Sequence, residues 1–361
     1  MSLPPLRIGV WAPVHGPRAA LQDPAEPFNA SWEHNRDTVL QAEALGYDAT
    51  LVAQHTVNPH LPDYDQLEAW TASAALAALT SRIEIIAAIK PYLYHPVVLA
   101  KMALQIENIS RGRFAFNLVN AWNRAEFEKA GIPFGEHDER YAYGREWITV
   151  VEKLIRGESV THTGENFALT DYLLTPKDLH RARPRIYLGG ESEPARALAA
   201  DAADVFFING QPLEDVTAFI ADLRRRPRTL APLSFGLAAF VIARETEREA
   251  QEEYQRLAAL AARDASVRAA QAARTDPNVV MVKTFAKSER VGTNGGTAAG
   301  LVGSYDQVAE RIRAFHAAGI ELFMLQFQPL TVELARFAQE VFPRLGRAAP
   351  PRVELRQSQA G

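Results

Sequence analysis

The chain has 361 residues, a length that fits two average domains or one large barrel with insertions. Hydrophobic residues make up 47% and charged residues 23%, which excludes a disordered protein and indicates a sizeable core. The formal net charge of -4 gives no sign of the clustered positive charge that nucleic acids or anionic membranes require of a partner.

The sequence contains no cysteine, which excludes disulfides, thiolate catalysis and cysteine-ligated zinc or iron–sulfur clusters. Residues 1–7 do not place an apolar stretch behind a basic end, and no run of 18 apolar residues occurs. We therefore expect a cytoplasmic protein that does not enter the membrane.

Eight short apolar runs alternate with longer segments of helical spacing, a pattern typical of βαβ units on a parallel sheet. The first unit is complete, because Leu40 and Ala44 share a helical face and Gly46 ends that helix. The runs are almost continuously apolar, as strands covered on both faces are. Eight strands close a (β/α)₈ TIM barrel, and we predict this α/β fold with strands at residues 8–11, 50–53, 83–89, 114–119, 185–188, 205–208, 235–243 and 322–327.

A minimal barrel needs about 250 residues, so about 110 residues remain for insertions, which we place at about 120–184 and 245–303. Within the first, residues 159–173 alternate polar and apolar around a Gly-Glu-Asn turn and predict a hairpin. The second begins with an Ala-rich helix or helix pair over residues 245–274. We expect one domain over residues 1–346 and a disordered tail over residues 347–361.

The usual catalytic motifs are absent, since the sequence has no G-x-S-x-G, Walker A or H-E-x-x-H pattern. The glycines of residues 292–300 miss the G-x-G-x-x-G spacing, which argues against a Rossmann fold. His55, His60 and Asp63 follow the second strand, but three such residues in a proline-containing loop are more typical of solvated side chains than of a metal site. We therefore predict no metal.

Asn117 interrupts the apolar fourth strand near its carboxyl end, where barrel enzymes carry their chemistry. An unpaired buried amide costs about 1–3 kcal/mol, so a partner for this side chain is expected. The partner is either a side chain of a neighbouring strand or a bound ligand. Near it, Trp11, Trp122 and Tyr141 would either wall a flat aromatic ligand or belong to the core.

The fifth strand is followed by Gly189 and Gly190, which let the backbone approach a ligand closely. A helix that begins near Pro194 would offer free N–H groups to an anion such as a phosphate. An ordinary turn capped by Ser192 is the alternative, and the Glu191 carboxylate would repel a phosphate unless it points away.

Five motifs, in this order, resemble the bacterial luciferase-like flavin monooxygenases over nearly the whole chain. The resemblance is strongest to the two-component alkanesulfonate and dimethylsulfone monooxygenase branch, with the pyrimidine monooxygenases as near cousins. The motifs are RFAFNLV at 113–119 followed by Trp122, HDERY at 137–141, Gly189-Gly190 with Ser192, FVIARET at 240–246 and LVGS at 301–304. The family fold is a barrel with insertions, in agreement with the eight runs.

The resemblance implies roles for individual positions. It places Asn117 near the reactive edge of a flavin, Trp122 beside it, and His55 as a proton-transfer residue, and these three are the predicted catalytic residues. Glu68 stands where relatives keep an acidic residue. The predicted cofactor-binding residues are Ala53, Ala88, Asn117, Tyr141, Gly189, Gly190, Glu191 and Ser192.

The resemblance also implies an enzyme that uses FMNH₂ and O₂ to oxidise a small, organosulfur substrate. A transient NAD(P)H:FMN reductase would supply the reduced flavin, and a homodimer or homotetramer is expected. A deazaflavin-dependent oxidoreductase and a non-catalytic flavin-binding relative are the alternatives. Residues 283–303, rich in Lys, Gly and Thr, would act as a lid, with Lys287 and Arg290 as anion-contacting or merely solvated residues.

Three departures from the family pattern bear on the substrate. Glu191 replaces a serine, Ala88 stands where the pyrimidine enzymes have threonine, and residues 236–240 lack the Arg and His of the alkanesulfonate enzymes. A buried sulfonate needs a paired cation. Unless Lys90 or Arg290 supplies it, we expect a neutral or weakly polar substrate that is closer to a sulfone than to a sulfonate.

Overall fold

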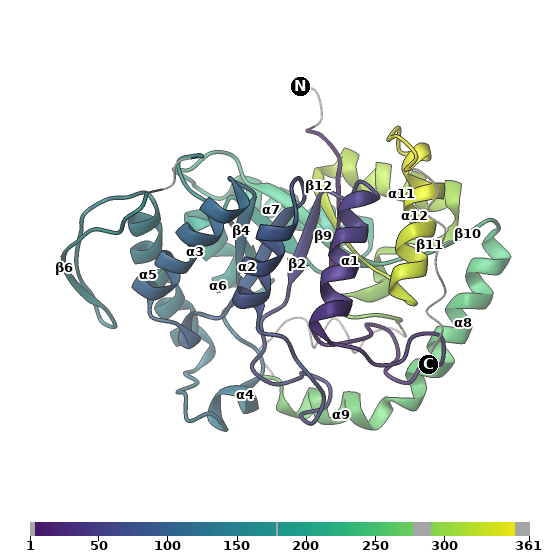
Figure 1. Ribbon diagram of the computed structural model, residues 1–361, viewed down its shortest axis with the longest axis horizontal. Coiled ribbons are helices and arrows are strands. Elements are labelled where there is room, and N and C mark those ends of the chain that lie inside the picture. The colour runs from purple at the N-terminus through teal and green to yellow at the C-terminus, as the bar shows by residue number, and fades with distance from the viewer. Residues whose placement is uncertain (1–3, 178–179, 277–289, 351–361) are drawn as a thin grey trace.

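The computed structural model describes residues 4–177, 180–276 and 290–350. It confirms the predicted TIM barrel: eight parallel strands form one closed ring in the order β1-β12-β9-β8-β7-β4-β3-β2 (Figure 1). Strands that follow one another along the chain are neighbours in the ring. The barrel strands are β1 (Arg7–Trp11), β2 (Ala49–Val52), β3 (Glu84–Ile89), β4 (Phe114–Leu118), β7 (Arg185–Gly189), β8 (Val205–Ile208), β9 (Ser234–Phe240) and β12 (Ile320–Gln326).

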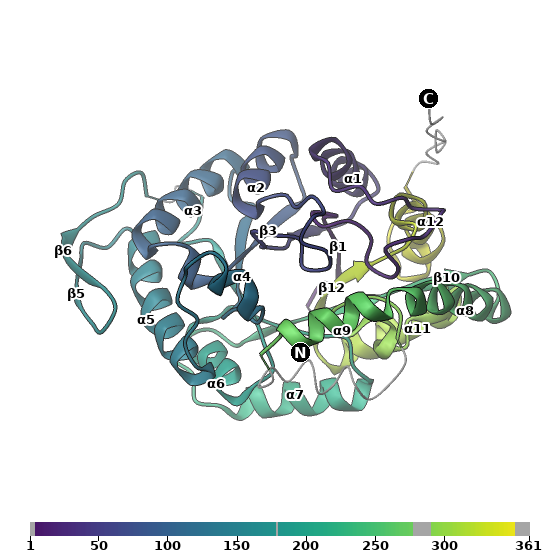
Figure 2. The same cartoon turned by 90° about the horizontal axis from the view of Figure 1, so that it is seen from below.

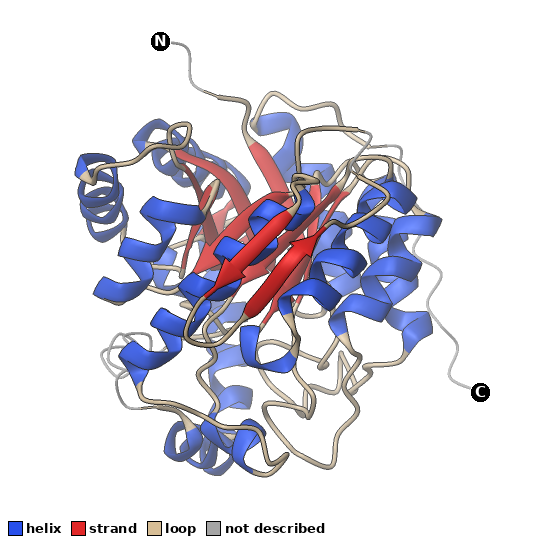
Figure 3. Ribbon diagram, turned by 90° about the vertical axis from the view of Figure 1, so that its left-hand side faces the viewer, coloured by secondary structure: helices blue, strands red, loops and turns tan. Residues whose placement is uncertain are grey.

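A helix follows each barrel strand and covers the outside of the ring, so that the strands lie inside a shell of helices (Figure 3). This arrangement explains the unbroken apolar runs, because every residue of β2, β3 and β4 is buried. No helix among the described residues is long and apolar enough to cross a membrane. The helices that cover the ring are α1 (Trp32–Ala44), α2 (Ala69–Leu79), α3 (Pro96–Ser110), α5 (His137–Ile155), α6 (Glu193–Ala202), α7 (Leu213–Arg225), α11 (Tyr305–Ala318) and α12 (Leu330–Arg344).

The first insertion contains the short helix α4 (Arg124–Glu128) and the predicted hairpin, which is confirmed. Its strands β5 (Val160–Thr163) and β6 (Ala168–Tyr172) pair antiparallel and project away from the barrel, at the left of Figures 1 and 2. A short 3₁₀ helix, η1 (Pro91–Leu93), follows β3.

The second insertion contains the predicted helix pair, α8 (Glu247–Arg263) and α9 (Ala265–Arg274). Helix α9 lies across one side of the barrel mouth, at the bottom of Figure 1 and in front of the ring in Figure 2, whereas α8 lies at the right of both views. The pair is flanked by β10 (Ile242–Arg244) and β11 (Val302–Ser304), which form a separate parallel sheet, and η2 (Gly296–Ala299) precedes β11.

Two sequence-based boundaries are wrong. The run 235–243 is not one strand, because after Phe240 the chain leaves the barrel: the N–H of Val241 still bonds to β12, whereas that of Ile242 donates to Leu301. The predicted disordered tail includes Arg347, which forms an ion pair of 2.6 Å with Asp48. Residues 351–361 of that tail lie outside the described residues.

A buried carboxylate holds the loop that leads into β3. Glu43, near the end of α1, accepts backbone N–H groups from Ser81 (2.8 Å), Arg82 and Ile83 (3.1 Å). These three N–H groups come directly before β3 and do not bond to the backbone of any described helix or strand. The Glu43 carboxylate therefore fixes where β3 begins.

We predict that Glu43→Gln lowers the free energy of unfolding by about 1–3 kcal/mol, because an amide cannot accept all three charge-assisted bonds. Glu33→Gln, at an exposed position on the same helix, should change it by less than about 0.5 kcal/mol. Chemical denaturation measures both values. Equal losses in the two variants would contradict the role assigned to Glu43.

Candidate active site

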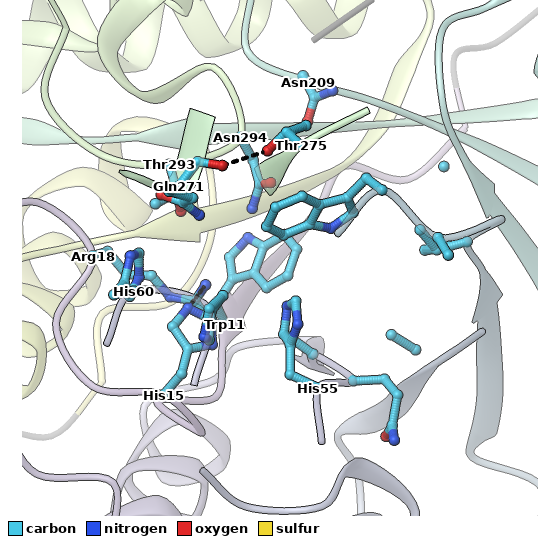
Figure 4. Close-up of a pocket in the computed structure, with 18 of the residues that line it drawn as sticks. Trp11, His15, Arg18, His55, His60, Asn209, Gln271, Thr275, Thr293 and Asn294 are labelled. Atoms are coloured by element: carbon cyan, nitrogen blue, oxygen red, sulfur yellow. Dashed lines mark hydrogen bonds between the residues drawn. The ribbon is translucent and has the colours of Figure 1, made fainter. Parts of the chain in front are cut away.

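A cavity of about 640 Å³ opens at the carboxyl ends of the barrel strands, beneath α9 (Figure 4). The closed ring brings these strand ends together from distant parts of the chain. Of the ten site residues predicted from the sequence, all but Ser192 line this cavity: Ala53, His55, Ala88, Asn117, Trp122, Tyr141, Gly189, Gly190 and Glu191.

Asn117 lies on β4 between Ala88 of β3 and Tyr187 of β7. Its side chain is only 4% exposed, and its Oδ1 atom has no hydrogen-bond partner among the described residues. The alternative of a bond to a neighbouring strand side chain is therefore not supported. A buried amide oxygen without a partner indicates a position that a ligand completes.

The turn after β7, the strand next to β4, also lines the cavity. Gly190 has a φ of +128°, and a Cβ atom there would lie 3.0 Å from the hydroxyl of Tyr141, so only glycine fits. The Ser192 hydroxyl caps α6 by accepting the N–H of Ala195 (3.4 Å). Burial raises the pKa of Tyr141, while its hydrogen bond to Ser192 opposes the shift.

Glu191 points away from the glycine turn. Its carboxylate accepts the backbone N–H of Asn209 (3.1 Å) and the side-chain amide of Gln211 (2.8 Å). Burial raises the pKa of Glu191, and these hydrogen bonds only partly offset the effect. The repulsion that its charge would exert on an anion at Gly190 is therefore reduced.

His55 belongs to a buried cluster of charged groups that sequence reasoning did not find. Lys90 Nζ lies 2.5 Å from Glu126 Oε2, and the two side chains are 3% and 0% exposed. The Nδ1 atom of His55 lies 3.2 Å from Lys90 Nζ and 3.4 Å from Glu126 Oε2. Nδ1 can therefore accept a hydrogen bond from Lys90 in one tautomer of His55 or donate one to Glu126 in the other. The Nε2 atom makes no bond to a described residue.

The environment keeps His55 neutral at pH 7. Burial and the nearby Lys90 charge lower the pKa of His55 to about 4. Burial would raise the pKa of Glu126, but its hydrogen bond to His55 and the Lys90 charge lower it to about 2. Trp122 closes this side of the cavity, with its ring 5.6 Å from that of His55 in an edge-on arrangement.

Two further side chains of the cavity, His15 and Arg18, escaped the motif search, whereas Trp11 was predicted either to wall a ligand or to belong to the core. Trp11, His15 and Arg18 come from the end of β1 and the loop after it, and they lie near His60 (Figure 4). The only sequence feature that could have predicted His15 and Arg18 was their position after the first strand, where the barrel mouth begins. His60 faces the cavity and His55 is buried, so the expectation of solvated side chains holds only for Asp63.

Two other expectations also change. Glu68 does not line the cavity: its carboxylate caps α2 and accepts a bond from the hydroxyl of Tyr94 (3.0 Å). The predicted lid is described only from Arg290 onward, and Lys287 lies outside the described residues. The segment from Arg290 onward is held against the barrel. The backbone N–H of Thr293 donates to the side-chain oxygen of Gln326, and the carbonyl of Asn294 accepts the N–H of Gly210.

The model of the family described as luciferase-like monooxygenase matches residues 6–322. The chain belongs to this family. The resemblance predicted from the five motifs is thereby confirmed, and the enzyme is a luciferase-like monooxygenase in which the cavity at the barrel mouth is the candidate active site.

Two curated relatives of this luciferase-like chain carry the name FMNH(2)-dependent dimethylsulfone monooxygenase. The protein from Pseudomonas putida is 31% identical over 347 residues, 94% of this chain and 95% of its own. The protein from Pseudomonas fluorescens (strain Pf0-1) is 31% identical over 351 residues, 95% of each chain. Among solved structures, a long-chain alkane monooxygenase (LadA) shares the fold, with a TM-score of 0.80 at 18% identity over 98% of this chain and 94% of its own.

The buried state of His55 makes stability depend on pH. An unfolded histidine has a pKa of about 6.5, so the unfolded chain binds this proton more readily than the folded chain between pH 6.5 and 4. We predict that wild type loses stability relative to His55→Gln across this interval, by up to about 1.4 kcal/mol per pH unit, with a constant difference above pH 7. Denaturation at a series of pH values measures it. Parallel curves for the two proteins would contradict the assignment.

Proposed function

We propose that this chain is an FMNH₂-dependent monooxygenase that uses O₂ to oxidise a small organosulfur compound, with reduced flavin delivered by a separate NAD(P)H:FMN reductase. The observation that carries the proposal is the buried Asn117 amide, whose oxygen has no partner among the described residues at the mouth of the barrel. The two curated relatives support the cofactor and the substrate class, because both are named for FMNH₂ and dimethylsulfone.

The residues present fit a flavin mononucleotide. At one end, the glycine turn leaves room under the Tyr141 hydroxyl that any side chain at Gly190 would fill, as a phosphate cradle requires. Toward the centre, the amide of Asn117 lies beside Gly189 and lacks an internal partner. On the other side of Asn117, at the ends of β3 and β2, the small side chains of Ala88 and Ala53 leave space for a flat ring.

When bound, reduced FMN supplies the electrons with which O₂ is activated. Asn117 would position the reacting groups by donating a hydrogen bond from Nδ2 to oxygen or to the flavin edge, and its unpartnered Oδ1 would accept one from the same ligand. Trp11 and Trp122 wall the cavity and α9 lies over one side of it, which limits the access of water to the reacting atoms.

His55 holds or moves a proton at Nε2, the ring nitrogen without a partner among the described residues. It is neutral at pH 7, so Nε2 can accept a hydrogen bond or a proton in the tautomer whose Nδ1–H faces Glu126, and its pKa of about 4 makes the protonated form short-lived. The imidazolium that results would lie 3.4 Å from the Glu126 carboxylate, which fixes the ring orientation and opposes the repulsion from the Lys90 charge at 3.2 Å. Glu126 is thus a positioning residue.

The same proposal includes a cytoplasmic homodimer or homotetramer. Large apolar side chains are exposed on the outer helices α2 and α3, at Leu79, Val98 and Ile109, and a further subunit would cover such positions. Light scattering on the purified protein distinguishes these assemblies from a monomer.

We predict that Asn117→Ala leaves the melting temperature nearly unchanged, because no internal hydrogen bond to Oδ1 is lost. The same variant should lower kcat/KM for O₂-dependent turnover about 100-fold or more, as removal of a positioned donor does. The assay combines the protein, a flavin reductase, FMN and dimethylsulfone, and follows product formation.

Asn108→Ala is the matched control, because Asn108 lies on α3 and bonds only to its own helix through Leu104 (2.9 Å). It should retain wild-type turnover. Wild-type turnover in Asn117→Ala would rule out the role proposed for the amide.

A further inference from the structure

Arg18 is a buried cation that lacks an acidic partner. Its residue is 8% exposed, and none of the ion pairs between described residues includes it. The guanidinium stacks over the ring of Trp11 at 4.9 Å, donates from Nη1 to His15 Nε2 (2.7 Å) and donates from Nη2 to the carbonyl of Ala12 (3.1 Å). Three of its five N–H groups therefore have no acceptor among the described residues.

The neighbouring side chains do not neutralise this charge. His15 must accept the bond from Arg18, so it is the neutral Nδ1–H tautomer, and burial lowers its pKa well below the usual value. Glu26 and Asp264, on adjacent segments, instead accept the backbone N–H groups of Leu330 and Leu21. Burial of an unpaired guanidinium is costly, and stacking on one indole offsets only part of that cost.

The other buried cations of the cavity are compensated. Lys90 is paired with Glu126, and Arg140 is paired with Asp276. Lys90 is therefore not free to bind a substrate anion, contrary to one option left open by the sequence. On β9 the stretch that carries cations in the alkanesulfonate enzymes is apolar here. Two other arginines line the cavity, but Arg268 is exposed, and Arg290 is half-buried and has an interaction of its own. Arg18 is therefore the fully buried cation of the cavity without an acidic partner among the described residues.

The position of Arg18 separates it from the glycine turn. It follows β1, whereas Gly190 follows β7, and three strands lie between them on either side of the ring. In Figure 4 Arg18 lies with His15 and His60 on one side of Trp11, away from Asn209, which follows β8. A flavin phosphate at Gly190 would leave Arg18 available at the opposite side.

We propose that Arg18, oriented by His15 and Trp11, is a specificity-determining residue that binds a singly charged oxyanion of the substrate, such as a sulfonate, sulfinate or carboxylate. The proposal rests on the proposed function for the reaction, and it replaces the expectation of a neutral substrate. A planar guanidinium with three free N–H groups suits an oxyanion that accepts two bonds at once.

Methanesulfonate and dimethylsulfone test the proposal, because they differ mainly in one charged oxygen against one methyl group. Isothermal titration of each into the FMN-saturated protein should give tighter binding of methanesulfonate. Arg18→Gln should weaken methanesulfonate binding about 10-fold to 100-fold, as loss of charge-assisted bonds does, and leave dimethylsulfone binding unchanged. Arg18→Lys should give an intermediate affinity for methanesulfonate, because lysine keeps the positive charge but lacks the planar guanidinium that donates two parallel hydrogen bonds.

Arg313→Gln, an exposed arginine on α11, is the control and should bind both compounds as wild type does. The oxyanion that Arg18 binds could belong to the substrate or to the phosphate of FMN. Titration with FMN and with riboflavin, which lacks the phosphate, distinguishes the two. If Arg18 instead held the flavin phosphate, Arg18→Gln would weaken FMN but not riboflavin, and the proposal would be overturned. Thermal denaturation checks that each variant is folded.

Wild-type binding of dimethylsulfone that is as tight as that of methanesulfonate would also overturn the proposal, even if Arg18→Gln failed to fold. So would an equal effect of Arg18→Gln on both compounds. Failure of the proposed function looks different: methanesulfonate would still bind in an Arg18-dependent manner, but no O₂-dependent turnover of any organosulfur compound would follow.

Discussion

Closure of eight parallel strands into one ring is the constraint on which the rest of the structure depends. Because all strands run in the same direction, all of their carboxyl ends meet at one mouth. His55, Asn117 and Gly190 are far apart in the sequence, yet they line the same cavity. His55 and Asn117 are more than nine-tenths buried there, so each polar side chain needs a partner from the protein or from a ligand.

The cavity meets this need in two ways. Around His55 the protein supplies both charges, since Lys90 and Glu126 form a buried pair that orients the imidazole. At Asn117 the described residues supply no partner for Oδ1, and at Arg18 they supply acceptors for only two of its five N–H groups, so hydrogen-bonding capacity is left unused. The first arrangement fixes geometry and proton state before a ligand arrives, and the second provides binding energy that a ligand with complementary groups can realise.

Sequence reasoning found the barrel because each strand is a short apolar run between amphipathic segments, a pattern that local sequence carries. It located Asn117 for the same reason, as one polar residue inside such a run. Glu126 was missed because it lies on the five-residue helix α4, which has no periodicity to interpret. Arg18 lies in a proline-rich loop, and its burial follows only from tertiary contacts such as those of Gln328 with Ala19 and Ala20.

The central claim is that the cavity binds reduced FMN and couples it to oxygen. Anaerobic titration of the protein with reduced FMN and with reduced deazaflavin, followed by admission of O₂ in the presence of an organosulfur substrate, tests it most directly. The account predicts binding of reduced FMN and consumption of O₂ with formation of oxidised substrate. Selective binding of the reduced deazaflavin, with substrate conversion that does not require O₂, would contradict it.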